Sequence, residues 1–230
     1  MIFSSSQPQL KRTTRRLNRR TFVFCLAVAG TPLAACSQGT GEGYVRTVTG
    51  SNLYVRDCWN YPFDLQPSFF GANPLASNQM AIRVQRGDDN EEVSDGLSVM
   101  IYDVDKVRGE LHTPIPVGLP LGVSPPGMPL RVNPDPPIVS LVLYLHDSCN
   151  AQNGVIYSVG GQITFNSLFS GNANETDSDK RLTDASFDSI QFADPRDMAL
   201  DYTFPDRVTS NVTAWFKFYF QRGQPAQPFP

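Results

Sequence analysis

Four cysteines have the clearest chemical options in this sequence. Cys25 and Cys36 lie in or directly after a basic and apolar N-terminal stretch, whereas Cys58 and Cys149 lie in the main part of the chain. The N-terminal stretch has the pattern of an export signal, described below, in which Cys25 would be removed and Cys36 modified. The two remaining thiols of an exported chain most often form a disulfide, so we expect Cys58 to be bonded to Cys149. The alternative is a metal site that adds His146, which stands three residues before Cys149.

Two acidic loops offer oxygen ligands for calcium, which takes about six to eight of them. The first loop is RGDDNEEVSDG, residues 86–96, and its candidate ligands are Asp88, Asp89, Asn90, Glu92 and Asp95. The second is NANETDSDKRLTDASFD, residues 172–188, with Asp177, Asp179 and Asp184. Neither loop has the ligand order of an EF-hand, and solvated turns are the alternative interpretation.

Aromatic residues suggest a second kind of site. Trp59 and Trp215, with Tyr61 and Tyr219, could form a flat platform on which a sugar ring stacks. The alternative is that these side chains are core or half-buried strand residues.

Familiar catalytic arrangements are missing from the sequence. There is no Gly-x-Ser-x-Gly, no His-Glu-x-x-His, no phosphate-binding glycine loop and no dinucleotide fingerprint. The two histidines, His112 and His146, stand outside any such motif. Asp103 and Asp105 would lie on one strand face, which could suggest a catalytic carboxylate pair, but a solvated strand edge beside Lys106 and Arg108 is the favoured explanation. These observations favour a role other than catalysis.

The N-terminal stretch is typical of a signal peptide. Residues 1–35 contain six basic residues and no acidic one, followed by a short apolar run from Phe22 to Ala29. A membrane-spanning helix needs roughly 20 apolar residues, and this run is too short for that. A mitochondrial transit peptide shares the basic composition, but it does not explain the apolar run that leads into Leu-Ala-Ala-Cys.

Leu33-Ala34-Ala35-Cys36 is similar to the lipobox of bacterial lipoproteins. That resemblance implies cleavage after Ala35 and lipidation of Cys36, with several acyl chains that anchor the protein to a membrane. Arg19-Arg20-Thr21-Phe22 is similar to the twin-arginine export signal. The general secretory route remains the alternative, because Phe24 replaces the usual lysine.

Removal of the leader changes the charge of the protein. Of 19 basic residues six lie before residue 36, so 13 remain against 22 acidic residues, a net charge of −9. Nucleic acids bind through basic residues that neutralise phosphates, so we expect no nucleic-acid partner. We expect the lipid anchor to be the contact with the membrane.

The rest of the chain has the pattern of an all-β protein. Apolar residues recur at every second position in many short runs, and turn residues separate the runs. We therefore predict a single β-sandwich, jelly-roll or immunoglobulin-like, over residues 44–230. The predicted strands cover residues 44–50, 53–58, 80–86, 97–104, 138–147, 155–159, 162–169, 185–192 and 212–222.

Two segments are predicted to lie outside the sheets. Residues 36–43 are rich in glycine and serine and are expected to be a flexible tether that carries Cys36. Residues 113–137 hold nine of the 19 prolines, so we expect neither a helix nor a central strand there. Aliphatic residues such as Ile115 and Val117 favour an extended crossover lying on the sandwich, and a polyproline ligand for another protein is the alternative.

With the lipobox, the stretch YLHDSCNAQNG (144–154) and the ending FYFQRGQPAQPFP (218–230), the chain resembles uncharacterised envelope lipoproteins of myxobacteria and related deltaproteobacteria. The resemblance implies no activity and no catalytic residue. Ser37 after the lipidated cysteine implies sorting to the outer membrane of a Gram-negative cell. We therefore expect a lipid-anchored, non-enzymatic binding or scaffolding module with a protein or glycan partner. The alternatives are a carbohydrate-binding or carbohydrate-cleaving domain and a calcium-dependent adhesion module.

Overall fold

The structure is a computed structural model that describes residues 38–75, 78–87, 94–129, 136–150 and 152–221, all within one compact unit. The leader and Cys36 lie outside the described residues. The predictions of a signal peptide over 1–35 and of lipidation at Cys36 therefore stay predictions.

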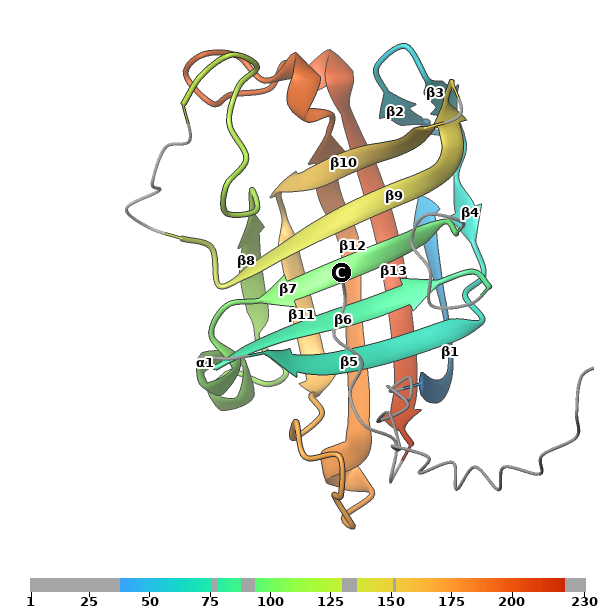
Figure 1. The fold of residues 1–230 in the computed structure, drawn as a ribbon, viewed down its shortest axis with the longest axis vertical. Coiled ribbons are helices and arrows are strands. Elements are labelled where there is room, and N and C mark those ends of the chain that lie inside the picture. Colours follow the sequence, from blue (N-terminus) through green and yellow to red (C-terminus); the bar gives the residue numbers. More distant parts are fainter. Residues whose placement is uncertain (1–37, 76–77, 88–93, 130–135, 151, 222–230) are drawn as a thin grey trace, which may run out of the picture. The chain divides into compact units, whose positions relative to one another are not determined.

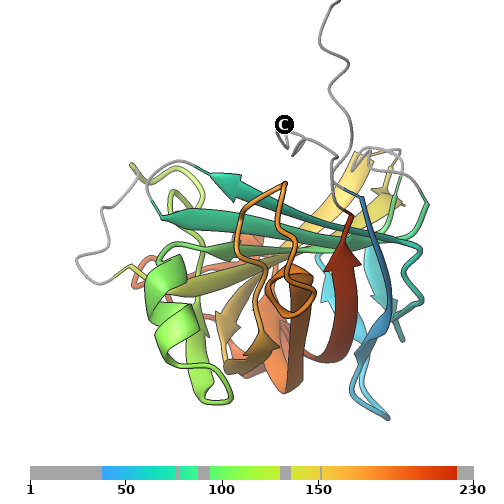
Figure 2. The same ribbon diagram turned by 90° about the horizontal axis from the view of Figure 1, so that it is seen from below.

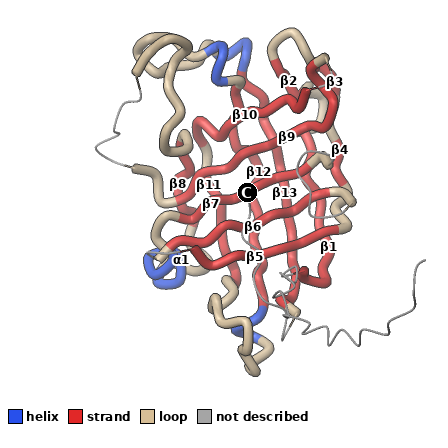
Figure 3. Tube along the Cα trace, viewed as in Figure 1, coloured by secondary structure: helices blue, strands red, loops and turns tan. Residues whose placement is uncertain are grey.

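Most of the described chain is strand (Figure 3). The large sheet contains β1 (Gln38–Thr47), β4 (Asp64–Leu65), β5 (Phe69–Leu75), β6 (Gln79–Gln85), β7 (Gly96–Ile101), β8 (Pro114–Gly118), β9 (Val139–Cys149), β10 (Gln152–Gly160), β11 (Gln162–Ser167), β12 (Leu182–Ala193) and β13 (Thr209–Phe220). A small sheet contains β2 (Leu53–Val55) and β3 (Trp59–Tyr61). Helices are short: α1 (Val104–Gly109) and the 3-10 turns η2 (Asp179–Arg181), η3 (Pro195–Asp197) and η4 (Asp206–Val208).

The large sheet folds into two packed layers whose strands run crosswise to each other (Figures 1 and 2). The front layer of Figure 1 contains β5, β6, β7, β9 and β10, and the back layer contains β1, β13, β12, β11 and β8. Two packed sheets around one core are the arrangement of a sandwich, so the predicted all-β sandwich is confirmed.

Hydrogen bonding continues from one layer to the other at both sides. On one side Gly39 of β1 is in register with Phe220 of β13 in the back layer and with Phe70 of β5 in the front layer. On the other side Tyr157 of β10 is in register with Val142 of β9 and with Ala193 of β12. This continuity pairs backbone groups that an open sheet edge would leave exposed.

Aromatic residues fill the space between the layers. Every second residue of β13, from Val212 to Phe220, is buried in the core, as the alternation in the sequence predicted. Phe218 stacks on Phe70 of the front layer at 5.6 Å between ring centroids. Such contacts hold the crossed layers together because aromatic pairs bury large apolar areas.

The predicted tether is wrong for residues 38–43, which form the first part of β1. Its glycines are needed for packing: a β-carbon added at Gly41 would come within 3.0 Å of Lys217 O and Phe218 Cβ. A β-carbon added at Gly43 would likewise come within 3.0 Å of Phe216 Cα. The glycine-rich composition therefore reflects close approach of β1 to β13, which sequence alone does not distinguish from flexibility.

The proline-rich segment contains a strand, which corrects the prediction that no central strand lies there. β8 is paired with β11 on one side and, in parallel, with β9 on the other. Pro114 and Pro116 are exposed, whereas Ile115 and Val117 are buried, and the Val117 amide donates to Gly161 O at 3.1 Å. The prolines alternate with Ile115 and Val117 along β8. Proline has no amide hydrogen, but the hydrogen bond to Gly161 O comes from Val117, so the prolines do not interrupt it.

The predicted carboxylate pair does not lie on a strand. Asp103 caps α1, where its side chain accepts a hydrogen bond from the Lys106 amide at 3.0 Å. Asp105 lies in the first helical turn, 3.9 Å from Arg108 Nη1. Both residues therefore stabilise a helix start.

Candidate functional site

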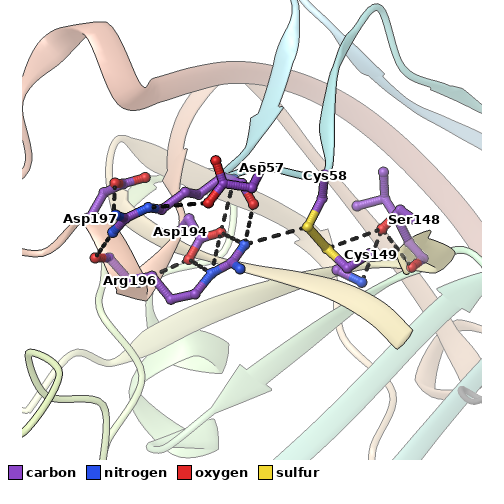
Figure 4. A network of polar contacts seen from close by, with 10 residues as sticks. Asp57, Cys58, Ser148, Cys149, Asp194, Arg196 and Asp197 are labelled. Carbon is purple, nitrogen blue, oxygen red and sulfur yellow. Dashed lines mark hydrogen bonds and ion pairs between the residues drawn. A yellow bond between two sulfur atoms is a disulfide. The ribbon is translucent and has the colours of Figure 1, made fainter. Parts of the chain in front are cut away.

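A dense polar network surrounds Asp194, which connects β12 to η3 (Figure 4). Its side chain is only 1% exposed. The carboxylate accepts hydrogen bonds from Arg196 Nε at 2.9 Å and from Arg196 Nη2 at 2.6 Å. It also accepts from the backbone amides of Arg196 and Arg56. This buried charge is therefore both paired and hydrogen-bonded, as a stable buried charge must be.

The structure contains a disulfide between Cys58 and Cys149, so the predicted pairing is confirmed. The polar network around Asp194 extends to this disulfide. Because both sulfur atoms are bonded, the metal site with His146 is wrong. Arg196 Nη2 lies 3.6 Å from Cys58 Sγ and donates to Arg56 O at 2.6 Å. The turn between β2 and β3 is thus fastened to the end of β9 by the disulfide and to the end of β12 by Asp194.

The network also shifts pKa values. The hydrogen bond with Asp194 raises the pKa of Arg196, and burial, followed by the Asp194 charge, raises the pKa of Tyr157. Burial raises the pKa of the Asp197 carboxyl more than the nearby Arg56 lowers it. Arg196 and Tyr157 therefore keep their protons at neutral pH. The network therefore has the properties of a structural site that links the turn between β2 and β3 to the end of β12.

Most calcium candidates of the first acidic loop lie outside the described part of the chain: Asp88, Asp89, Asn90 and Glu92 are not described, whereas Asp95 is. Asp177, Asp179 and Asp184 of the second loop are described. Asp95 Oδ1 accepts from the His146 amide at 2.8 Å, and Oδ2 lies 3.9 Å from Arg86 Nη1. Within the described ranges no three His, Cys, Asp or Glu side chains gather where they could share a metal ion.

The two tryptophans lie on different sheets. Trp59 of β3 donates from Nε1 to Tyr61 O at 3.1 Å and packs partly against the core. The Trp59 and Tyr61 rings pack at nearly a right angle, with 5.8 Å between their centroids, and Tyr61 is 66% exposed. Trp215 lies on the outer side of β13, in the large sheet. The structure therefore does not show the two predicted platform residues on a common surface.

Trp215 lies at the centre of what we call the back face, the outer side of β1, β13 and β12. The strand register places Tyr44 of β1 and Ser186 of β12 on either side of it. Arg46 lies over the Tyr44 ring, with its guanidinium carbon 4.5 Å from the centroid. This row is partly exposed and offers two neighbouring aromatic side chains to solvent.

The next row of the back face is charged. Lys217 of β13 stands between Glu42 of β1 and Asp184 of β12 in the strand register. An open pocket of about 330 Å³ lies beside this row, lined by residues that include Glu42, Lys217 and the 43% exposed Tyr219. The back face thus combines aromatic side chains with donors and acceptors on a rigid sheet.

The opposite surface, which we call the front face, is the outer side of β5, β6, β7 and β9. One row across these strands is Phe69, Gln85, Gly96 and Tyr144. Tyr144 Oη donates to Gln85 Oε1 at 2.6 Å. The hydroxyl reaches across β7 because Gly96 has no side chain, and a β-carbon there would come within 3.0 Å of it.

The next row of the front face contains a buried arginine. Gly71, Arg83, Ser98 and Val142 are in register, so small residues flank Arg83 on both neighbouring strands. Arg83 is 1% exposed, Gln85 is 0% exposed and Phe69 is 3% exposed. Within the described chain, no segment lies over β5, β6 and β7 in Figures 1 and 2. These outward side chains are buried, unlike those of the back face.

The sequence did not predict which outward residues of different strands lie together on the front face and on the back face. The sequence MAIRVQR was predicted to be a strand, but alternation there marks only which residues share a side. Arg83 and Gln85 on one side of an otherwise apolar strand were the available signal, since a charged residue is almost never fully buried without partners.

Comparison with known proteins does not assign this chain to a group. No family model matches it, and neither a curated protein nor a solved structure matches it. None of the helices in the described residues has the length and apolar character that crossing a membrane requires. The functional argument therefore rests on the residues and their geometry.

Proposed function

We propose that this chain is an exported lipoprotein, anchored through Cys36 to the outer membrane, whose folded domain is a non-enzymatic binding or scaffolding module. The signal-peptide pattern and lipobox support the export and the anchor. The disulfide supports the same compartment, because disulfides persist mainly in oxidising environments. Since β1 begins at Gln38, the anchor would be two residues from the sheet.

The observation that carries the binding role is the back face. Tyr44 and Trp215 lie side by side on paired strands in the middle of the back layer, with Lys217 and two carboxylates in the next row. Large aromatic side chains with polar neighbours are the residues that contribute most to binding surfaces. A rigid sheet presents them without a large loss of conformational entropy on binding.

These two rows of the back face favour a glycan as the partner. The specific form of the proposal is therefore a carbohydrate-binding module. The face of an indole or phenol ring packs against the apolar side of a sugar, while side chains such as Glu42 and Asp184 accept hydrogen bonds from hydroxyl groups. The structure supports Trp215 in this role more than Trp59, which is partly packed against the core.

The anchor is tested by replacing Cys36. We expect the Cys36→Ser variant to lose its acyl chains, measured by mass spectrometry, and to move from the detergent phase to the aqueous phase on partitioning. Cys25→Ser is the matched control, because Cys25 belongs to the segment that is removed. Unchanged detergent partitioning of Cys36→Ser would contradict the lipoprotein assignment.

The binding role is tested with insoluble peptidoglycan and with lipopolysaccharide vesicles as probes. We expect Trp215→Ala to weaken binding at least about tenfold, equivalent to about 1.4 kcal/mol. Trp59→Ala is the control and should bind normally. A wild-type protein that binds neither probe, or binding that Trp215→Ala leaves intact, would contradict the glycan proposal.

A further inference from the structure

The row of the back face that contains Trp215 extends beyond β1, β13 and β12. It continues from Ser186 of β12 to Thr164 of β11 and from there to Pro114 of β8. All of these residues are at least partly exposed. The row therefore crosses every strand of the back layer (Figure 1).

The charged row runs parallel to it and extends equally far. Asp184 of β12 accepts a hydrogen bond from Asn166 Nδ2 at 3.3 Å, and Asn166 Oδ1 lies 3.4 Å from His112 Nδ1. Asn166 belongs to β11, and His112 belongs to the segment between α1 and β8. The row that begins at Glu42 of β1 thus also reaches the far side of the back layer.

Open pockets lie on both sides of Trp215 in this direction. The pocket of about 330 Å³ beside Glu42 and Lys217 lies over β1 and β13. A second open pocket, of about 290 Å³, lies over β12, β11 and the start of β8, and its lining includes Ser186 and Thr164. Because Ser186 is in register with Trp215, the second pocket begins beside the indole. A chain bound on Trp215 can therefore continue into a pocket on either side.

A β-bulge shapes the second pocket. The register of β12 with β13 shifts between Phe187 and Ile190, and the consecutive residues Asp188 and Ser189 are both exposed. Bulges re-aim side chains and are common beside functional sites. Both residues line the pocket. Within the described part of the chain the Asp188 carboxylate has no hydrogen-bond or ion-pair partner, so it can accept hydrogen bonds from a ligand.

We infer that the back face binds a linear, uncharged glycan chain that lies across the strands and occupies both pockets, with Trp215 between them. The inference rests on the proposed glycan binding and adds the form of the ligand. From β1 to β8 the two rows cross four strand spacings, or about 19 Å, which accommodates about four sugar rings. A single sugar would contact only part of this surface.

The charges of the surface favour an uncharged chain. Their signs alternate from Glu42 to Lys217 to Asp184, at successive strand spacings of about 4.8 Å. A glycan with a charge of one sign on every sugar would place some of its charges beside like charges, which is unfavourable. Hydroxyl groups both donate and accept hydrogen bonds, so they match a row in which donors and acceptors alternate.

Binding of oligosaccharides of increasing length tests the inference. The probes are chito-oligosaccharides and cello-oligosaccharides, two uncharged series, titrated calorimetrically into the full, lipid-anchored protein in detergent micelles. We expect the tetrasaccharide of at least one series to bind at least about tenfold more tightly than the disaccharide, equivalent to about 1.4 kcal/mol. Longer chains should add little, because the back layer ends at β8. Oligogalacturonides, which have a carboxylate on every sugar, are the charged control and should bind more weakly at every length.

A matched pair of variants locates the chain. Thr164→Arg places a long side chain in the second pocket, so the preference for the tetrasaccharide over the disaccharide should disappear. Thr176→Arg makes the same change at an exposed position in the loop before η2, and it should keep the preference. Trp215→Ala should weaken binding at every length.

The outcomes separate this inference from the proposed function. Equal affinity for all lengths, a preference that Thr164→Arg leaves intact, or equal binding of the charged control would overturn the inference. Binding to peptidoglycan or lipopolysaccharide without binding to either uncharged series would overturn it as well, and would leave the proposed function in place. A protein that binds none of the probes would contradict the proposed function and, with it, the inference.

Discussion

The front face and the back face follow the same alternation rule but end in different environments. In both, every second residue of a strand points away from the core. On the back face the outward residues of β13 include Trp215, Lys217 and Tyr219, which remain partly exposed. On the front face the outward residues of β6 include Arg83 and Gln85, which are fully buried.

The difference lies in the neighbours of each charge. Lys217 has carboxylates in register on both sides, so its charge is balanced on an open surface. Arg83 has Gly71 and Ser98, two small uncharged residues, in register on its two sides. Outward orientation on a strand therefore does not by itself mean exposure to water.

The largest effect is expected at the disulfide, which joins the turn between β2 and β3 to the end of β9. Reduction, or a Cys58→Ala and Cys149→Ala double variant, should lower the free energy of unfolding by about 4 kcal/mol, because the bond closes a loop of 91 residues. Urea denaturation measures this change. Hydrogen exchange at Val84 of β6 and Phe216 of β13 should increase together if the layers unfold as one unit, and loss of protection in one layer alone would contradict that view.

A matched pair of variants measures the contrast between the faces directly. Arg83→Ala should destabilise the protein by about 3 kcal/mol, since it removes a large, fully buried side chain. Lys217→Ala should cost at most about 0.5 kcal/mol, because substitutions of partly exposed surface residues away from caps and cavities have small effects. Equal costs in urea denaturation would contradict the difference between the buried outward residue and the partly exposed one.

The smallest effects concern pH, away from both faces. The pKa of Asp197 is raised by burial, and its Oδ2 has no hydrogen-bond partner in the described part of the protein. A raised folded-state pKa means that Asp197 favours folding at low pH and that this contribution is lost as pH rises above the unfolded value of about 3.9. We expect Asp197→Asn to raise the melting temperature slightly at pH 7 and to have no such benefit at pH 3.

Asp201 provides the opposite sign as a control. Hydrogen bonds from Thr203 lower the pKa of this exposed carboxyl, so its contribution is present at neutral pH and is lost as pH falls through the folded-state value. Asp201→Asn should therefore lower the melting temperature at pH 7 more than at pH 3. Melting curves of the two variants that respond to pH in the same direction would contradict these assignments.

Several parts of the fold could be predicted because they depend on local pattern. Alternation predicted nine strands, among them β9 and β13, and compartment reasoning predicted the Cys58–Cys149 bond. β5 was missed because Gly71, Asn73 and Pro74 interrupt the apolar pattern, and β8 was missed because of its prolines. The first part of β1 was mistaken for a tether because glycine favours close packing and flexibility equally.

The candidate surfaces could not be predicted in the same way. Tyr44, Trp215 and Ser186 come from strands far apart in the sequence, and only the register of β1, β13 and β12 makes them neighbours. Asp194 and Arg196 were not recognised as a site because nothing nearby in the sequence indicates the turn that contains Arg56 and Cys58.

By itself, the sequence determined the periodicity of the strands, the residues that must face a core and the chemistry available to two thiols, because these follow from local geometry and composition. Only the tertiary structure decided which strands pair across the two edges, which outward residues are buried and which charges meet. Those outcomes depend on long-range register, and a pattern with a period of two residues contains no information about its partner strand.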